Sequence, residues 1–264
     1  MKSNSTIHSH DVSPLGPPVP VRTGDGGKAM ILAAGMGTRL KPFTDKHPKA
    51  LAIVNGKSLL QRNIEYLQSF GIKDVIVNVH HFADQIINMV KQSDGFGSNI
   101  VISDETNKVL ETGGGLKKAA FFFEKCEAFI LLNVDVLTDM NIGLMLKQHI
   151  TQKPLATLAV TNRKSSRYFL FDEIDNLCGW KNETTGEQKM SKEVAGYKQK
   201  AFSGIHIIST EIFSLMKMKE KFSMVDAYLH LAKSHTITAF DHSHSKFVDV
   251  GKPESIAIAE NLFV

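Results

Sequence analysis

Cysteine is scarce in this chain of 264 residues, which contains only Cys126 and Cys178. The two residues form no recognisable pairing pattern, so the sequence does not indicate a disulfide-stabilised fold. We expect free thiols in a reducing compartment, the cytoplasm, with a single disulfide between them as the alternative.

Long apolar runs and clusters of like charge are missing as well. No stretch of the sequence approaches the ~18 apolar residues that a membrane-spanning helix needs. The net charge is +4, and the basic residues are spread along the chain. This composition gives no case for a membrane or nucleic-acid partner, and it suits a small anionic substrate. With 42% hydrophobic residues, the chain can bury the core of one large domain.

Residues 1–27 lack the apolar core of a secretion signal and are rich in Ser, Thr, Pro, Gly and His. The prolines between Pro14 and Pro20 oppose a helix or an inner strand. We therefore expect a disordered extension over residues 1–27 and one folded domain over residues 28–264.

A glycine-bearing loop follows the first apolar segment, Met30–Ala34. Gly35 and Gly37 allow backbone conformations that a side chain would forbid, so successive N–H groups can converge on phosphate oxygens. Arg39 adds a forked donor and Lys49 adds a compact charge. The segment predicts a polyphosphate-binding site.

Two glycine motifs of other phosphate-binding proteins are missing here. The dinucleotide fingerprint needs a third glycine where the chain has Leu40, and the Walker loop needs a glycine where it has Leu51. These differences argue against a dinucleotide oxidoreductase and against a P-loop enzyme.

Two aspartates end or follow apolar strands in distant parts of the chain. Asp135 comes after Phe129–Leu132, and Asp249 lies within Phe247–Val250. Two carboxylates at the carboxyl ends of strands can hold Mg²⁺ together with phosphate oxygens and water. Either residue alone could instead be satisfied by local N–H groups, but the phosphate loop favours a metal site.

Strand and helix signals alternate through the first half of the chain, as in a doubly wound α/β sheet. The expected strands are 30–34, 75–79, 100–102 and 129–132, and the expected helices are 59–70, 82–92 and 116–124. In the second half we expect strands at 156–160, 168–171, 201–208 and 247–250, helices at 210–217 and 224–233, and a polar, mobile excursion at 181–197. These patterns predict one mixed, Rossmann-like sheet with its ligand crevice at the strand ends.

The segments Gly35–Leu40 and Pro48–Leu51 resemble the motifs of the sugar-1-phosphate nucleotidyltransferases. Glu111–Gly115, Asn133–Asp135, Phe202–Ile205 and Phe247–Gly251 extend the likeness to the bacterial N-acetylmuramate-1-phosphate uridylyltransferase-like branch. The resemblance covers residues 28–263. Its members begin almost at the first strand, which implies that residues 1–27 are an added leader.

The resemblance implies a role for each matching residue. Arg39 and Lys49 match the catalytic phosphate-binding cations, and Asp135 and Asp249 match the Mg²⁺ ligands. The nucleotide pocket is matched by Leu32, Ala33, Ala34, Gly35, Gly37, Thr38, Thr112 and Gly113, and the sugar-side wall by Ser203 and Gly204. The expected halves are residues 28–150 for the nucleotide and 151–264 for the sugar.

One residue departs from the pattern of the resembling proteins. Val134 stands where they usually have glycine. If the glycine allows a close approach of the ribose or a positive φ, a β-branched residue would crowd the nucleotide or strain the loop; if the backbone is extended there, valine would be harmless.

The expected reaction needs no nucleophilic side chain, because a phosphate monoester is itself a nucleophile. We expect transfer of a nucleotidyl group from a nucleoside triphosphate, with UTP as first choice, to a sugar-1-phosphate, with N-acetylmuramate-1-phosphate as first choice. The alternatives are guanylyl or thymidylyl transfer to a mannose- or glucose-type phosphate and, outside this class, a non-catalytic sugar-nucleotide sensor.

Several polar residues have weaker indications. Arg167 belongs to a cationic group with Arg163, Lys164 and Lys181, and we expect it to bind the lactyl carboxylate of a muramic substrate, a solvated surface being the alternative. The other expectations are that Asp104–Glu105 are solvated loop ends, that His242 and His244 are exposed, and that His80 or Trp180 either contacts a sugar or serves the fold.

Overall fold

The computed structural model describes residues 27–263. Apart from Gly27, the segment expected to be disordered lies outside the described residues. No helix within residues 27–263 is long and apolar enough to cross a membrane.

The first half of the chain builds the parallel part of a large mixed sheet. Its strands lie in the order β6-β1-β4-β5, with all neighbours parallel. Their bounds are β1 Lys28–Leu32, β4 Asp74–Val79, β5 Asn99–Asp104 and β6 Ala128–Asn133. Because all four run the same way, their carboxyl ends form one edge, where the ligand crevice of such sheets lies.

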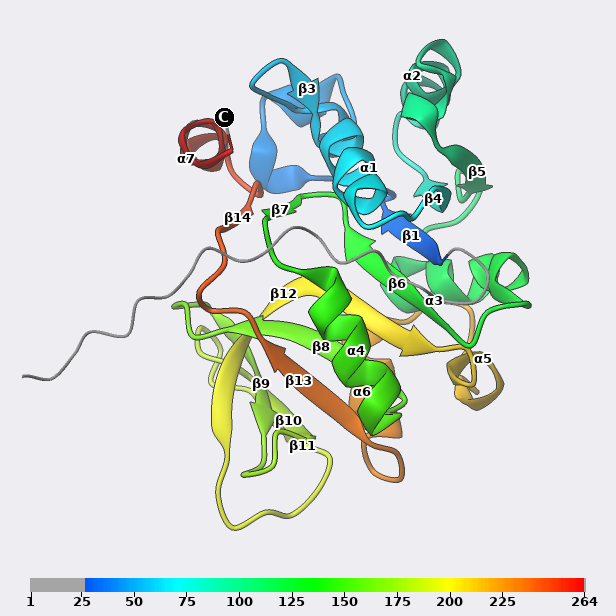
Figure 1. Ribbon diagram of the computed structural model, residues 1–264. Coiled ribbons are helices and arrows are strands. Elements are labelled where there is room, and N and C mark those ends of the chain that lie inside the picture. Colours follow the sequence, from blue (N-terminus) through cyan, green and yellow to red (C-terminus); the bar gives the residue numbers. More distant parts are fainter. Residues whose placement is uncertain (1–26, 264) are drawn as a thin grey trace, which may run out of the picture.

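The second half continues the same sheet with antiparallel strands. The long strand β12 pairs with β6 along one stretch and with β9 along another, and β8 and β13 branch from it. The strands are β8 Ala156–Thr161, β9 Arg167–Phe171, β10 Leu177–Asn182, β11 Gln188–Met190, β12 Lys198–Ser209 and β13 Ile237–Asp241. The β9–β11 strands lie at the opposite end of the molecule from α1 and α2 (Figure 1).

Helices cover both faces of the sheet, as a doubly wound fold requires. Alternate residues of β1 point to opposite sides: Ala29 and Ile31 pack with α1, α2 and α4, whereas Met30 and Leu32 pack with α3, α5 and α6. The helices are α1 Leu59–Ser69, α2 Ala83–Gln92, α3 Glu111–Lys118, α4 Ile142–Gln152, α5 Ile212–Leu215, α6 Met224–Leu231 and α7 Pro253–Leu262. The expected α/β fold with one mixed sheet is confirmed.

Two short strand pairs lie outside the large sheet. β2 (Ile53–Val54) and β3 (Lys57–Ser58) form a hairpin before α1. β7 (Val136–Thr138) pairs antiparallel with β14 (Phe247–Asp249), in a register that places Asp249 opposite Val136. This second pair joins segments more than a hundred residues apart.

Some expected elements differ from the structure. The helix expected from residue 116 begins at Glu111, and the segment 181–197 contains β11, which pairs with β10. Cys178 is a buried thiol whose Sγ donates to the Leu170 carbonyl at 3.2 Å. The alternative disulfide with Cys126 is therefore not formed.

Candidate functional site

The loop after β1 turns sharply at one of its two glycines. Gly37 has φ +61°, and a Cβ there would lie 2.9 Å from Thr44 Cγ2 and 3.0 Å from Lys49 Cβ. The Thr44 hydroxyl also donates to the Gly37 carbonyl at 2.9 Å, which fixes the turn. Gly35, by contrast, has no positive φ and open space where a Cβ would point. The conformational argument therefore holds for Gly37 and not for Gly35.

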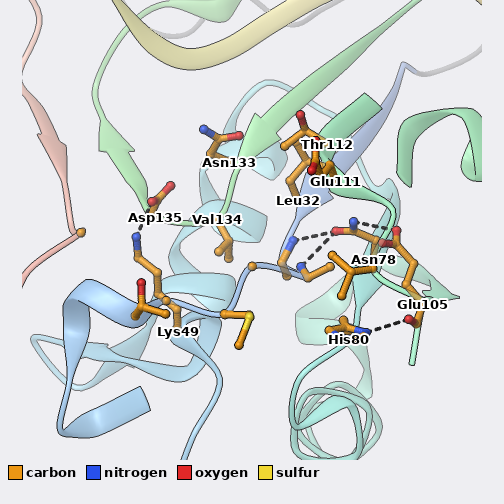
Figure 2. Close-up of a pocket in the computed structure, with 18 of the residues that line it drawn as sticks. Leu32, Lys49, Asn78, His80, Glu105, Glu111, Thr112, Asn133, Val134 and Asp135 are labelled. Atoms are coloured by element: carbon orange, nitrogen blue, oxygen red, sulfur yellow. Dashed lines mark hydrogen bonds and ion pairs between the residues drawn. The ribbon is translucent and has the colours of Figure 1, made fainter. Parts of the chain in front are cut away.

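Asn78, at the end of β4, anchors the start of this loop. Its Oδ1 accepts the N–H groups of Ala33 at 2.7 Å and Ala34 at 3.3 Å. Its Nδ2 donates to Glu105 Oε1 at 2.8 Å. Figure 2 shows Asn78 between the loop and Glu105, with its amide facing both. Beyond this anchor, Gly35, Met36, Gly37, Thr38 and Arg39 line a cavity of about 400 Å³.

Glu105 corrects one expectation and adds a site residue. It was expected to be solvated, but it is buried, and this burial raises the pKa of its carboxyl while the hydrogen bond from Asn78 opposes the rise. Its backbone carbonyl also lies 2.7 Å from His80 Nδ1, and His80 lines the 400 Å³ cavity. The sequence does contain one indication of this network, because Asn78 is a polar residue inside the otherwise apolar run 75–79.

Lys49 and Asp135 face each other at the edge of the cavity. Their side chains form an ion pair and are drawn pointing toward one another in Figure 2. Lys49 lies in a short 3₁₀ turn, Lys49–Leu51, and Asp135 follows the end of β6. Both side chains are mostly shielded from solvent, so the attraction between the opposite charges offsets part of the cost of burying them.

Val134 fits its position without strain. Its φ is not positive, its N–H donates to the Leu32 carbonyl at 3.2 Å, and its carbonyl accepts from Asn63 Nδ2 at 2.9 Å. The valine side chain packs into the core and also borders the 400 Å³ cavity. Val134 lies in the turn that follows β6, and because its φ is not positive, valine is tolerated there without backbone strain.

The β7–β14 pair brings Asp249 to Asp135. Val250, directly after Asp249, donates its N–H to the Asp135 carbonyl at 2.8 Å. Asp249 remains solvent-exposed, yet partial desolvation raises the pKa of its carboxyl. The charge of Asp135 raises that pKa further, and the cations Lys49, Arg39 and Arg163 oppose it. The two expected carboxylates are thus electrostatic neighbours.

The donor set at this point suits a hard cation such as Mg²⁺. Two carboxylates that repel each other are stabilised by a divalent ion between them, and Mg²⁺ is typically bound by one or two carboxylates plus phosphate oxygens and waters. Within residues 27–263, no cluster of three or more His, Cys, Asp or Glu side chains offers a complete protein-only cage. Asp135 and Asp249 are the residues that could hold such an ion.

A second cavity, of about 540 Å³, adjoins the first on the side of the antiparallel strands. The two share Arg39, Asn133 and Asp135 in their walls, so Asp135 lies where they meet, and Asp249 lines the second cavity. The second cavity is otherwise lined by residues of β9, β10, β12 and β14 and the segments next to them, including Arg163, Arg167, Trp180, Phe202 and Asp249.

The two residues expected from the α3 region are placed differently. Thr112 lines the 400 Å³ cavity, and its hydroxyl accepts the N–H of Met224 at 2.9 Å. Gly113 lies behind it, because its N–H donates to the Phe222 carbonyl at 2.9 Å and a Cβ there would meet the Phe222 ring at 2.4 Å. Gly113 therefore allows close packing of two segments.

The three residues expected on the sugar side all line the 540 Å³ cavity. Arg167 is exposed there, and Gly204 has φ +72° in the irregular part of β12. Ser203 is buried, and its hydroxyl is 2.7 Å from Nε2 of His242. His242 is itself buried and its pKa is lowered to about 4 by that burial, so the expectation that it is exposed was wrong.

Comparisons with known proteins agree with this geometry. The sequence model of a family described as nucleotidyl transferase matches residues 28–262. An N-acetylmuramate alpha-1-phosphate uridylyltransferase from Caulobacter vibrioides is 41% identical over 44% of this chain and 48% of its own length. A UTP–glucose-1-phosphate uridylyltransferase from Synechocystis is 28% identical over 85% of this chain and 60% of its own length. The chain thus spans about half to three fifths of these relatives.

Solved structures show the same fold at low sequence identity. HddC from Yersinia pseudotuberculosis, complexed with GMP-PN, has a TM-score of 0.72 and 24% identity and covers 90% of this chain and 100% of its own. A glucose-1-phosphate thymidylyltransferase described as putative, from Bacillus anthracis, has a TM-score of 0.74 and 18% identity over 89% of this chain and 94% of its own.

Proposed function

Because the chain belongs to the nucleotidyl transferase family, we propose that it transfers a nucleotidyl group from a nucleoside triphosphate to a sugar-1-phosphate. The proposal rests on one observation above all. Asp135 lies where two cavities join, and Asp249, Lys49 and Arg39 are its electrostatic neighbours there. Two cavities with a shared charged wall suit a reaction between two phosphate-bearing substrates.

The triphosphate is assigned to the 400 Å³ cavity, largely within residues 28–150, and the sugar phosphate to the 540 Å³ cavity, largely within residues 151–264. An oxygen of the sugar phosphate attacks the α-phosphorus, a new O–P bond forms, and the bond to the β-phosphate oxygen breaks. The electron pair of that bond leaves with pyrophosphate. Arg39 and Lys49 hold the triphosphate and stabilise the charge that develops on the leaving group.

Asp135 and Asp249 are the proposed Mg²⁺ ligands. When bound, the ion would neutralise phosphate charge and so reduce the repulsion between the two substrates. Lys49 is already paired with Asp135, so the same lysine is placed to balance a carboxylate before substrates bind.

UTP and N-acetylmuramate-1-phosphate are the proposed substrate pair. The relative from Caulobacter vibrioides supports this choice through its 41% identity, although it is matched over only 117 residues. The exposed cation Arg167 in the wall of the sugar cavity would complement the carboxylate that distinguishes a muramic sugar from glucosamine.

Guanylyl transfer to a mannose-type phosphate is the second candidate. A mannose-1-phosphate guanyltransferase from Yarrowia lipolytica is 26% identical over 90% of this chain and 64% of its own length. A non-catalytic sensor is the less favoured alternative, because the four charged residues of the proposed reaction are all present and grouped at the cavities.

A matrix of nucleoside triphosphates against sugar-1-phosphates, with pyrophosphate release as the readout, tests the proposal. We expect turnover with a sugar-1-phosphate only when Mg²⁺ is present, and the highest kcat/KM for UTP with N-acetylmuramate-1-phosphate. Higher kcat/KM for glucose- or mannose-1-phosphate would reject the substrate choice and leave the reaction class intact. Absence of pyrophosphate release with every pair would reject the catalytic proposal.

A further inference from the structure

Arg163 is held rigidly at the wall of the sugar cavity. One guanidinium nitrogen, Nη2, donates to the Phe202 carbonyl at 2.8 Å, and Nη1 donates to the Thr161 hydroxyl at 3.1 Å. The guanidinium carbon also lies 4.6 Å from the centre of the Phe247 ring. Contacts on two edges and one face leave the planar group little freedom to turn.

The charge of Arg163 has no carboxylate directly against it. No ion pair within 4.0 Å includes Arg163 in the part of the chain that the structure describes. Desolvation lowers the pKa of this half-buried arginine, while Asp249 and Tyr168 raise it. Two of its five N–H groups are engaged through the bonds to Phe202 and Thr161, so three remain for another acceptor.

The position of Arg163 relates it to the carboxylate pair. It lines the 540 Å³ cavity together with Asp249 and Arg39, and it is one of the cations that oppose the raised pKa of Asp249. A sugar phosphate that enters this cavity brings negative charge toward Asp135 and Asp249. An oxyanion beside two carboxylates is repelled unless fixed positive charge balances it.

Arg39 and Lys49 are assigned to the triphosphate, so the sugar phosphate needs a cation of its own. Arg167, the other arginine on the sugar side, is exposed and was assigned to a substituent of the sugar. Lys181 is paired with Glu183 at 2.9 Å, and Lys164 does not line the cavity. Arg163 is the pre-positioned cation that remains beside Asp249.

We propose that Arg163 binds the phosphate oxygens of the sugar-1-phosphate and holds this nucleophile next to the carboxylate pair. The proposal rests on the proposed nucleotidyl transfer and names a substrate contact for it. A phosphate is common to every sugar-1-phosphate, so Arg163 acts on all of them alike. Arg167, in contrast, distinguishes one sugar from another.

The test compares Arg163→Gln and Arg163→Lys with Lys164→Gln, which changes the neighbouring exposed charge outside the cavity. For Arg163→Gln we expect the KM for each sugar-1-phosphate to rise about 10- to 100-fold, as for loss of a charged hydrogen bond, with the KM for the triphosphate unchanged within about twofold. Arg163→Lys keeps a charge without the fork and should give an intermediate KM. Lys164→Gln should behave as the wild type.

Chemical rescue distinguishes a purely structural role of Arg163 from direct binding of the sugar phosphate. Arg163→Ala leaves a gap at the cavity wall, and added guanidinium ion should lower the raised KM for the sugar-1-phosphate while leaving the KM for the triphosphate as it was. If Arg163 only held Phe202 and Phe247 in place, its loss would raise both KM values together, and added guanidinium ion would not lower them. If Arg163→Gln and Arg163→Ala do not fold, the Arg163→Lys variant provides the test. The proposal then requires a raised KM for the sugar-1-phosphate and an unchanged KM for the triphosphate.

Failure of the inference and failure of the proposed function give different results. The inference is overturned if the wild type is active and the Arg163 variants keep the wild-type KM for sugar-1-phosphates, or if both KM values rise in parallel. The proposed function fails instead if the wild-type protein itself releases no pyrophosphate with any sugar-1-phosphate.

Discussion

Gly37 shows how one residue determines the shape of the phosphate loop. Its φ of +61° is a conformation that residues with a Cβ rarely adopt, and the space that a side chain would need is taken by Thr44 and Lys49. Since Lys49 also pairs with Asp135, displacement at Gly37 reaches the carboxylate site as well.

We predict that Gly37→Val abolishes binding of the nucleoside triphosphate, with affinity lowered at least about 100-fold, because a β-branched residue resists this backbone conformation and displaces Lys49. Calorimetric titration measures the affinity. Gly56→Val is the matched control, because Gly56 has φ +75° in the β2–β3 turn with open space around it. The control should lose stability and keep its affinity; equal affinity for both variants and the wild type would contradict the role of Gly37.

Arg167 is predicted to select among sugars rather than to drive the reaction. Arg167→Ala should raise the KM for N-acetylmuramate-1-phosphate more than that for N-acetylglucosamine-1-phosphate, by a ratio that corresponds to about 1.5–3 kcal/mol for one charged hydrogen bond. Steady-state kinetics with both sugars measures the ratio. An equal change for the two sugars would show that Arg167 does not contact the lactyl carboxylate.

At the scale of elements, the helices and strands with clear periodic patterns were predictable, and α3 was not fully so. Three consecutive glycines, Gly113 to Gly115, disfavour a helix by propensity, yet α3 begins at Glu111. A Cβ at Gly114 would lie 2.0 Å from the Glu220 carbonyl oxygen, so tertiary packing and not local preference explains the glycines. No single-sequence pattern reports a contact with a segment a hundred residues away.

The sequences of α4 and β13 also carry local signals for secondary structure. Asn141 caps α4 by accepting the N–H of Leu144 at 3.2 Å, and the buried residues Ile142, Met145 and Leu146 follow a helical spacing. β13 is a short strand with the sequence Ile-Thr-Ala-Phe-Asp, and it pairs parallel with β8. Asp135 and Asp249 could be predicted because they stand at the ends of apolar strands. The roles of Arg163 and Glu105 could not be predicted in this way, because they depend on which loops the fold brings together.

Two buried histidines connect helices to the sheet and predict how stability depends on pH. His149 Nδ1 lies 2.9 Å from the Thr157 hydroxyl, and His206 Nδ1 lies 2.7 Å from the Tyr228 hydroxyl. Burial lowers the pKa of His149 to about 4 and that of His206 to about 3, below the unfolded value of 6.5. The unfolded chain therefore binds more protons than the folded one between pH 6.5 and these values, so stability is lost as the pH falls.

Urea unfolding between pH 7 and pH 4.5 measures this dependence. Each histidine should contribute a slope of up to about 1.4 kcal/mol per pH unit below pH 6.5. In the His149→Asn, His206→Asn double variant, the asparagine amide places a polar atom near the former position of each Nδ1. We expect this variant to be less stable than the wild type at pH 7, and its unfolding free energy to fall less steeply as the pH is lowered. Part of the pH dependence should remain, because His242 is also a buried histidine with a lowered pKa. His244→Asn, at an exposed position, should match the wild type. An unchanged slope in the double variant would refute the assignment.

At the scale of the whole molecule, the site depends on both ends of the described chain. Strand β14 returns from residue 247 to pair with β7, and this pairing puts Asp249 beside Asp135. The sheet supplies the rest, because β1, β4 and β6 end at the first cavity while β9, β10 and β12 wall the second. One continuous sheet therefore places the two cavities side by side, with Asp135 in the wall of both and Asp249 in the wall of the second.

The most direct test of this account is the rate of pyrophosphate release by Asp135→Asn and Asp249→Asn at saturating substrates and Mg²⁺. Each substitution keeps the shape of the side chain and removes its charge, so we predict a loss in turnover of at least about 100-fold with the circular dichroism spectrum unchanged. Asp241→Asn, which removes the ion pair with Lys200 outside both cavities, should retain the wild-type rate. Near-normal, Mg²⁺-dependent rates in both Asp135→Asn and Asp249→Asn would contradict the claim that these two carboxylates form the reaction centre.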